Sequence, residues 1–129
     1  SEIYDLGQGG TSFSGGDRRA LHPSNISALR NKIHGISRVT RTFTPAFLVQ
    51  GVGIEVADNL VTDVPHVAVE LHGNDHQVVR NNFTHISFEC GDCGAIMSSR
   101  SFTYYGNEIS HNHFRDVAST AEYTAMENV

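Results

Sequence analysis

The stretch Val56-Ala57-Asp58-Asn59-Leu60-Val61-Thr62-Asp63-Val64 decides the fold, because its spacing of apolar residues around an asparagine recurs along the chain. In each copy an apolar residue stands three positions before the asparagine, and two more stand two and five positions after it. The full copies are residues 28–36, 56–64, 78–86 and 109–117, and a partial copy, 1–6, has serine at the asparagine position.

These copies predict a β-solenoid. Apolar and polar residues alternate with a period of two, no stripe with a helical period persists, and each segment is too short for a helix of a helical solenoid. The unequal spacing of the copies is typical of a solenoid with loops inserted at one corner. We expect the four asparagines to form an internal ladder, in which each side-chain amide bonds to the coils above and below it: Asn31, Asn59, Asn81 and Asn112.

A further strand in each coil is predicted by aligning residues 8–15, 44–51, 66–73 and 92–99. One inward column is then Phe13, Val49, Leu71 and Met97, and a second is Thr11, Phe47, Val69 and Ala95. The outward residues are Ser12, Leu48, Glu70 and Ile96, followed by Ser14, Gln50, His72 and Ser98. Both alignments give the same coil order, which predicts an all-β parallel β-helix of about five coils as one domain, 1–129.

The ends of the chain fall inside the repeat. Ser1 begins in mid-copy, and the tail 118–129 has no pattern of a capping helix. Because solenoids cover their terminal coils, we expect further coils in a longer chain, or self-stacking of the uncapped ends.

Composition narrows the class of partner. With 39% apolar and 18% charged residues the chain is expected to fold, and its net charge of -5 argues against a nucleic-acid partner. No apolar run approaches the ~20 residues that a membrane helix needs, so no membrane partner is expected.

Several motifs carry a resemblance that covers nearly the whole chain. They are Gly15-Gly16-Asp17-Arg18, Arg41-Thr42-Phe43-Thr44-Pro45-Ala46, Gly51-Val52-Gly53, residues 59–66, Gly73-Asn74-Asp75-His76 and Glu89-Cys90-Gly91-Asp92-Cys93-Gly94-Ala95-Ile96. In these the chain resembles right-handed parallel β-helix proteins of the pectate-lyase-like class, and among them the fucosidase- and xylanase-type glycoside hydrolases. The resemblance implies a secreted or extracellular protein that acts on a polysaccharide without a cofactor. The segment 121–127 lacks the acidic pair that such proteins commonly show, so a non-catalytic glycan-binding, structural or assembly module is the alternative.

The candidate catalytic residues follow from stacking. Adjacent coils lie ~4.8 Å apart, so the column Gln8, Thr44, His66 and Asp92 would place His66 beside Asp92. Glycoside hydrolysis needs two carboxylates, about 5–5.5 Å apart or about 6.5–9.5 Å apart. Asp92 is the first candidate, Glu70 or Glu89 its partner, and His66 would orient Asp92. Alternatively, Asp92 caps a turn and His66 is a packed histidine.

Substrate contacts are expected on the same outer face and on the loops that follow this strand. The candidates are Asp17, Arg18, His72, Asp75, Arg100 and Tyr104, because amides and carboxylates bind sugar hydroxyls and arginine binds acidic groups. An ion pair between Asp17 and Arg18, or Tyr104 covering a coil edge, is the structural alternative. A polysaccharide lyase, with arginines neutralising a uronate, is a further alternative.

The cysteines give a weaker signal. Cys90 and Cys93 form a C-x-x-C, which is half of a zinc site or a redox pair. We expect packed or loop thiols first and a local disulfide next, because no second ligand pair is evident. Metal sites at His72 and His76, or at His111 and His113, are less favoured, and no metal is expected.

Overall fold

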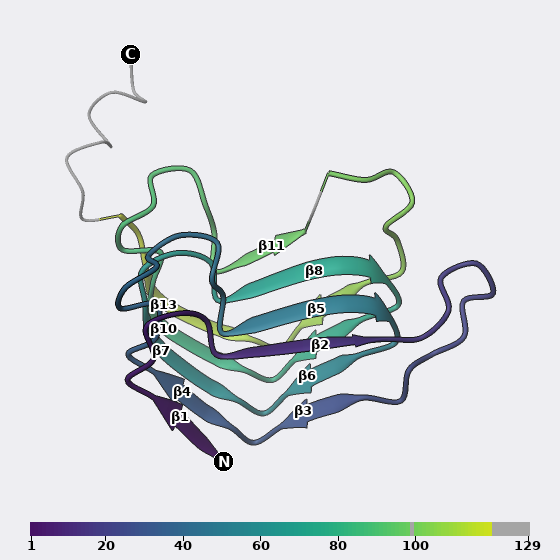
Figure 1. The fold of residues 1–129 in the computed structure, drawn as a ribbon, viewed down its shortest axis with the longest axis horizontal. Helices are drawn as coiled ribbons and strands as arrows, with labels where there is room; N and C mark the ends of the chain where they lie inside the picture. Colours follow the sequence, from purple (N-terminus) through teal and green to yellow (C-terminus); the bar gives the residue numbers. More distant parts are fainter. Residues whose placement is uncertain (99, 120–129) are drawn as a thin grey trace.

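The computed structural model describes residues 1–98 and 100–119, and it confirms an all-β parallel solenoid (Figure 1). The strands of the first sheet are β1 (Glu2–Tyr4), β4 (Lys32–His34), β7 (Leu60–Val64), β10 (Asn82–Ile86) and β13 (His113–Val117). Those of the second sheet are β2 (Thr11–Gly15), β5 (Phe47–Val52), β8 (Val69–Asn74) and β11 (Ile96–Ser98). The third sheet contains β3 (Ser27–Leu29), β6 (Glu55–Ala57), β9 (Gln77–Val79) and β12 (Glu108–Ser110). The segments 121–127 and most of 118–129, named above, lie outside the described residues.

The predicted repeat supplies the first and third sheets. One column of the first sheet is Ile3, Ile33, Val61, Phe83 and Phe114, and the matching column of the third is Ala28, Val56, Val78 and Ile109. Because every neighbouring pair is parallel and in register, these apolar residues stack. All of them belong to the core or pack against it except Ile109 and Phe114 of the last coil, which are exposed. In each full copy the asparagine lies on the chain between the strand of the third sheet and the strand of the first sheet.

The asparagine ladder is present as predicted. Asn59 Oδ1 accepts from the side-chain amide of Asn31 at 3.1 Å and from its backbone N–H at 2.9 Å. The same pair of bonds joins Asn59 to Asn81 and Asn81 to Asn112. The residue before each ladder asparagine has a left-handed φ of 54–57°: Arg30, Asp58, Arg80 and His111. The chain thus bends between the two sheets without glycine, and the ladder satisfies polar groups that the bend exposes.

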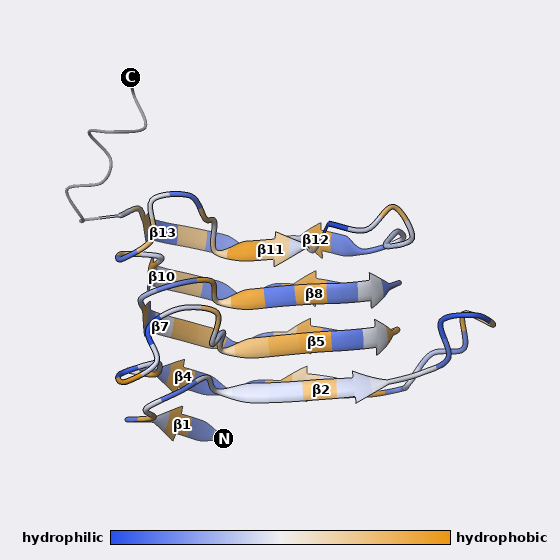
Figure 2. Ribbon diagram, turned by 45° about the horizontal axis from the view of Figure 1, so that its top comes forward, coloured by the Kyte–Doolittle hydropathy of each residue, from blue (hydrophilic) through white to orange (hydrophobic). Residues whose placement is uncertain are grey.

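The core runs along the solenoid axis. Ile33, Val61, Phe83, Phe47 and Val49 are fully buried, and Figure 2 shows apolar and polar bands alternating along the strands. Each such side chain stabilises the fold by about 1.5–3 kcal/mol relative to an exposed one. No described residue belongs to a helix that is long and apolar enough to cross a membrane.

The second sheet confirms the predicted register in three strands and corrects it in the fourth. Phe13, Val49 and Leu71 stack, as expected. In β11, however, Ile96 pairs with Val69 and Met97 with Glu70, so Ile96 turns inward and Met97 outward. The predicted alignment of Ala95 with Val69 was therefore wrong by one residue. Ala95 is buried in the core as predicted, but it precedes the strand, and its C=O accepts from both Ala68 and Val69 N–H.

Candidate functional site

The outer face of the second sheet carries the candidate site. Side chains there point away from the core because strand residues alternate, and in β8 the buried Val69 and Leu71 alternate with the half-buried Glu70 and His72. The outward residues beside them are Leu48, Gln50 and Met97. We call this set, with the loops that contact it, the outer face.

Glu70 and His72 form a hydrogen-bonded pair on this face. Glu70 Oε1 lies 2.8 Å from His72 Nε2, and both side chains are largely shielded from solvent, at 15% and 23% exposure. The two residues are neighbours because positions two apart on a strand share a face. A shielded carboxylate held by an imidazole can accept hydrogen bonds from a ligand hydroxyl or exchange a proton with it.

The loop after β2 joins the loop after β11 through Arg18. Its Nε donates to Asn74 Oδ1 at 3.1 Å, and one terminal nitrogen donates to Thr103 Oγ1 at 2.8 Å. The guanidinium lies over the Tyr104 ring, 4.6 Å from its centre. Tyr104 in turn meets His72 edge-on, with ring centres 6.1 Å apart. Both loops lie at the carboxyl end of the second sheet (Figure 1), where the Tyr104 ring contacts both Arg18 and His72.

Two open hollows are lined by residues of the outer face and its loops. The first has a volume of about 350 Å³ and is lined by Phe43, Glu70, Met97, Ser98 and Arg100. The second has a volume of about 420 Å³ and is lined by Arg18, Arg19, Asn74, Phe102, Thr103 and Tyr105. The first hollow combines a carboxylate, a guanidinium and an aromatic ring, so it offers a ligand an acceptor, a cation and an apolar surface.

The register of β11 moves Asp92 away from its predicted place. Counting back along the observed alignment, Cys93 rather than Asp92 takes the position next to His66, and Asp92 is exposed on the loop before β11. His66 and both cysteines do meet: one ring nitrogen and the two sulfur atoms lie within 4.8 Å of one another. The predicted His66–Asp92 column is therefore a His66–Cys93 column.

Cys90 and Cys93 are joined by a disulfide. The favoured expectation of two thiols was wrong, and the disulfide that ranked second is the one found. His66 itself is buried, and its ring packs against Phe43 with the centres 4.7 Å apart. Burial lowers the pKa of His66, and the Glu70 charge opposes that shift more weakly.

Glu89 is engaged by an arginine rather than by the outer face. Both Glu89 carboxylate oxygens accept from Arg41, Oε2 at 2.9 Å from Nε and Oε1 from a terminal nitrogen. The hydrogen bond from Arg41 lowers the pKa of Glu89, and the same contact raises the pKa of Arg41. This ion pair fixes the loop before β11 to the loop before β5.

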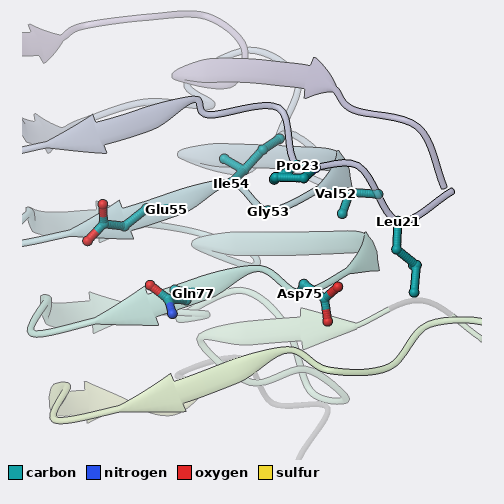
Figure 3. Close-up of a pocket in the computed structure, with 8 residues that line it drawn as sticks. All are labelled: Leu21, Pro23, Val52, Gly53, Ile54, Glu55, Asp75 and Gln77. Atoms are coloured by element: carbon teal, nitrogen blue, oxygen red, sulfur yellow. The ribbon is translucent and has the colours of Figure 1, made fainter.

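Asp17 and Asp75, the two aspartates predicted to contact the substrate, make other contacts. Asp17 Oδ1 accepts from the backbone N–H of Arg19 at 2.9 Å, so Asp17 caps its own loop instead of pairing with Arg18. Asp75 lines a different hollow, of about 340 Å³, between the second and third sheets. Figure 3 shows Asp75 near Leu21 at one end of that hollow and Glu55 beside Gln77 at the other. Asp75 is thus not brought to Glu70.

The ring nitrogens of His72 and His76 that the structure describes with partners are engaged within the protein. His72 is held by Glu70, and His76 is fully buried, with Nδ1 accepting from Ile54 N–H at 3.2 Å. Sequence reasoning missed Asn74, Thr103 and Phe43 as parts of the site. Phe43 and Asn74 stood inside motifs of the resemblance, with Asn74 at the end of β8. Phe43 and Thr103 lie on loops, which follow no period that would have placed them.

Comparison of the chain with protein-family models, with curated proteins and with solved structures finds no match.

Proposed function

We propose that the chain is a right-handed parallel β-helix of about five coils, similar to the pectate-lyase-like proteins, that binds a polysaccharide on the outer face. The observation that carries the proposal is the shielded Glu70, hydrogen-bonded to His72, which lines a hollow together with Phe43 and Arg100. The hand is supported by general topology, since connections between parallel strands of one sheet are nearly always right-handed.

The chemistry of the hollow fits a sugar. Glu70 can accept hydrogen bonds from hydroxyl groups, and the Phe43 ring offers an apolar surface to a pyranose face. Arg100 adds a cation that would bind an acidic sugar. The second hollow, lined in part by Arg18, Asn74 and Thr103, offers further polar groups, and a chain of several sugars needs more than one such hollow.

Glycoside hydrolysis is the second candidate, because Glu70 is a shielded carboxylate with an imidazole that could hold or pass on its proton. The reaction needs two carboxylates. Glu89 is held by Arg41 and Asp92 is exposed on the loop before β11. Binding therefore ranks ahead of hydrolysis.

An extracellular location is part of the proposal. The Cys90–Cys93 disulfide supports it, since disulfides persist in oxidising compartments.

Binding to a panel of neutral and acidic polysaccharides, followed by calorimetry on the best one, tests the proposal. We expect Glu70→Gln to weaken binding about 10- to 100-fold, because a hydrogen bond to a charged group contributes about 1.5–3 kcal/mol. Glu108→Gln, an exposed glutamate of the third sheet, should bind as the parent does. Failure of every polysaccharide to bind, or equal binding by Glu70→Gln, would contradict the proposal. If the parent chain releases reducing ends from a polysaccharide and Glu70→Gln does not, that result would favour hydrolysis.

A further inference from the structure

His66, Cys90 and Cys93 form a cluster of potential metal ligands beside the outer face. His66 lies just before β8, and the two cysteines lie on the loop between β10 and β11. A ring nitrogen of His66 and both sulfur atoms are within 4.8 Å of one another. Chain segments from two successive coils thus bring one nitrogen and two sulfur donors together.

The imidazole of His66 has an unmet polar atom. His66 is only 7% exposed, and its Nδ1 is buried without a hydrogen-bond partner, the one such side-chain atom among the described residues. Leaving a buried polar group unpaired costs about 1–3 kcal/mol. A ligand that takes the lone pair of this nitrogen would remove that cost.

The donor set selects a soft or borderline cation. Neutral imidazole and thiolate are the usual ligands of Zn²⁺ in proteins. Two thiolates balance the double charge of Zn²⁺, so the loaded cluster adds no net charge to a partly buried place.

We propose that the reduced chain binds one Zn²⁺ through His66, Cys90 and Cys93. Zn–S bonds of about 2.3 Å and Zn–N bonds of about 2.0–2.1 Å leave tetrahedral ligands roughly 3.5–4 Å apart, within the reach of this cluster. Three protein ligands leave a fourth position for water. In the oxidised chain the disulfide engages both sulfurs, so the site belongs to the reduced form.

A phosphine can reduce the Cys90–Cys93 disulfide and so open the site. The disulfide gains two electrons and two protons and becomes two thiols, while the phosphine takes the oxygen of one water molecule and becomes a phosphine oxide. On binding, Zn²⁺ displaces the two thiol protons, which pass to solvent. The proposal does not depend on polysaccharide binding.

Zinc titration of the full chain in competition with a chromophoric chelator tests the site, after reduction with a phosphine and anaerobic removal of the reductant. We expect one Zn²⁺ per reduced chain and none per oxidised chain. Co²⁺ in place of Zn²⁺ should give sulfur-to-cobalt charge-transfer bands and the visible absorption of a tetrahedral site.

Variants test whether all three residues bind the zinc ion, or whether the two cysteines bind it without His66. His66→Phe keeps a ring against Phe43 and removes both nitrogens, so zinc affinity should fall at least tenfold while the thermal midpoint confirms folding. His113→Phe, a matched change at an exposed histidine, should bind as the parent does. Cys90→Ser and Cys93→Ser should each lose the cobalt charge-transfer bands of a two-thiolate site. No zinc on the reduced chain, or unchanged affinity in His66→Phe, would overturn the proposal.

Discussion

Asn81 Oδ1 accepts two hydrogen bonds from Asn59, one from its backbone N–H and one from its side-chain amide, each at 2.9 Å. The Asn81 amide in turn donates to Val56 C=O at 2.8 Å and to Asn112 Oδ1 at 3.0 Å. One side chain therefore satisfies backbone groups of the neighbouring coil and continues the ladder. Since the residue before each asparagine bends into the left-handed region, the ladder pins the bend between the first and third sheets.

Asn81→Ala is expected to destabilise the chain by about 2–5 kcal/mol. The change leaves the buried Asn59 N–H without its hydrogen-bond acceptor and removes one hydrogen-bond donor from Val56 C=O. Each buried group that loses its partner costs about 1–3 kcal/mol. Urea unfolding followed by circular dichroism measures the loss. Asn82→Ala is the control: Asn82 is exposed on the next position, and its effect should stay within about 0.5 kcal/mol. Equal midpoints for the two variants would contradict a structural role for the ladder.

Gly73→Ala is expected to unfold or strongly destabilise the second sheet. Gly73 has a φ of 121°, and a Cβ there would lie 2.0 Å from Gly51 C=O oxygen on the adjacent strand. The left-handed backbone alone costs about 1–3 kcal/mol for a residue with a side chain, and the clash forces β5 and β8 apart. The thermal midpoint measures the effect.

Gly94→Ala is the control for this change. A Cβ at Gly94 would meet its nearest atom at 3.6 Å, an ordinary contact. We expect its midpoint to remain within a few degrees of the parent. If Gly73→Ala were as stable as Gly94→Ala, the close contact between Gly73 and Gly51 would not limit the stability of the second sheet.

The repeat could be predicted because its residues are fixed by stacking. Ile33, Val61 and Phe83 occupy one column, and a shift by one residue would turn each of them to solvent. The same alternation correctly placed Glu70 and His72 outward. The ladder followed from asparagine recurring at one position of the copies.

The register of β11 could not be read in the same way. Ala95, Ile96 and Met97 are three apolar residues in a row, so no alternation shows which of them points inward. The double hydrogen bond to Ala95 C=O decides it, and no sequence pattern encodes that bond. The Arg18–Tyr104 contact was hidden for a related reason, because it joins two loops that follow no period.

Acidification below neutral pH is expected to destabilise the fold through His76. Its Nδ1 accepts from Ile54 N–H and its Nε2 donates to His72 C=O, so the buried ring is neutral. Burial lowers the pKa of His76 in the folded chain, and the hydrogen bond to His72 opposes this more weakly. The unfolded chain, with a histidine pKa of about 6.5, thus binds the proton first. The stability that His76 contributes is present above about pH 6.5 and is lost as the pH falls through the lower folded value.

Urea midpoints between pH 7.5 and 5.5 measure this dependence. The uptake of one proton changes the free energy of unfolding by at most about 1.4 kcal/mol per pH unit. His76→Gln should reduce the slope of the free energy of unfolding against pH by the part that His76 contributes. His66, whose pKa burial also lowers, keeps contributing in that variant. Asn81→Ala, which removes no titrating group, should lower the midpoint at every pH and leave the slope intact. A slope that persists fully in His76→Gln would assign the dependence to other groups.

Arg18→Ala is expected to release the loop 100–106 from the outer face. The change removes the hydrogen bonds to Asn74 and Thr103 and the contact with the Tyr104 ring, which together hold this loop to the loop after β2. Chymotrypsin cleaves after aromatic residues, and Phe102 and Tyr105 are already exposed there. A loss of about 1–2 kcal/mol of loop docking should raise the cleavage rate roughly 5- to 30-fold. Arg19→Ala, at the next position, is the control, because the Arg19 side chain makes no hydrogen bond to the described part of this loop. Equal cleavage of the two variants would show that contacts other than those of Arg18 hold the loop.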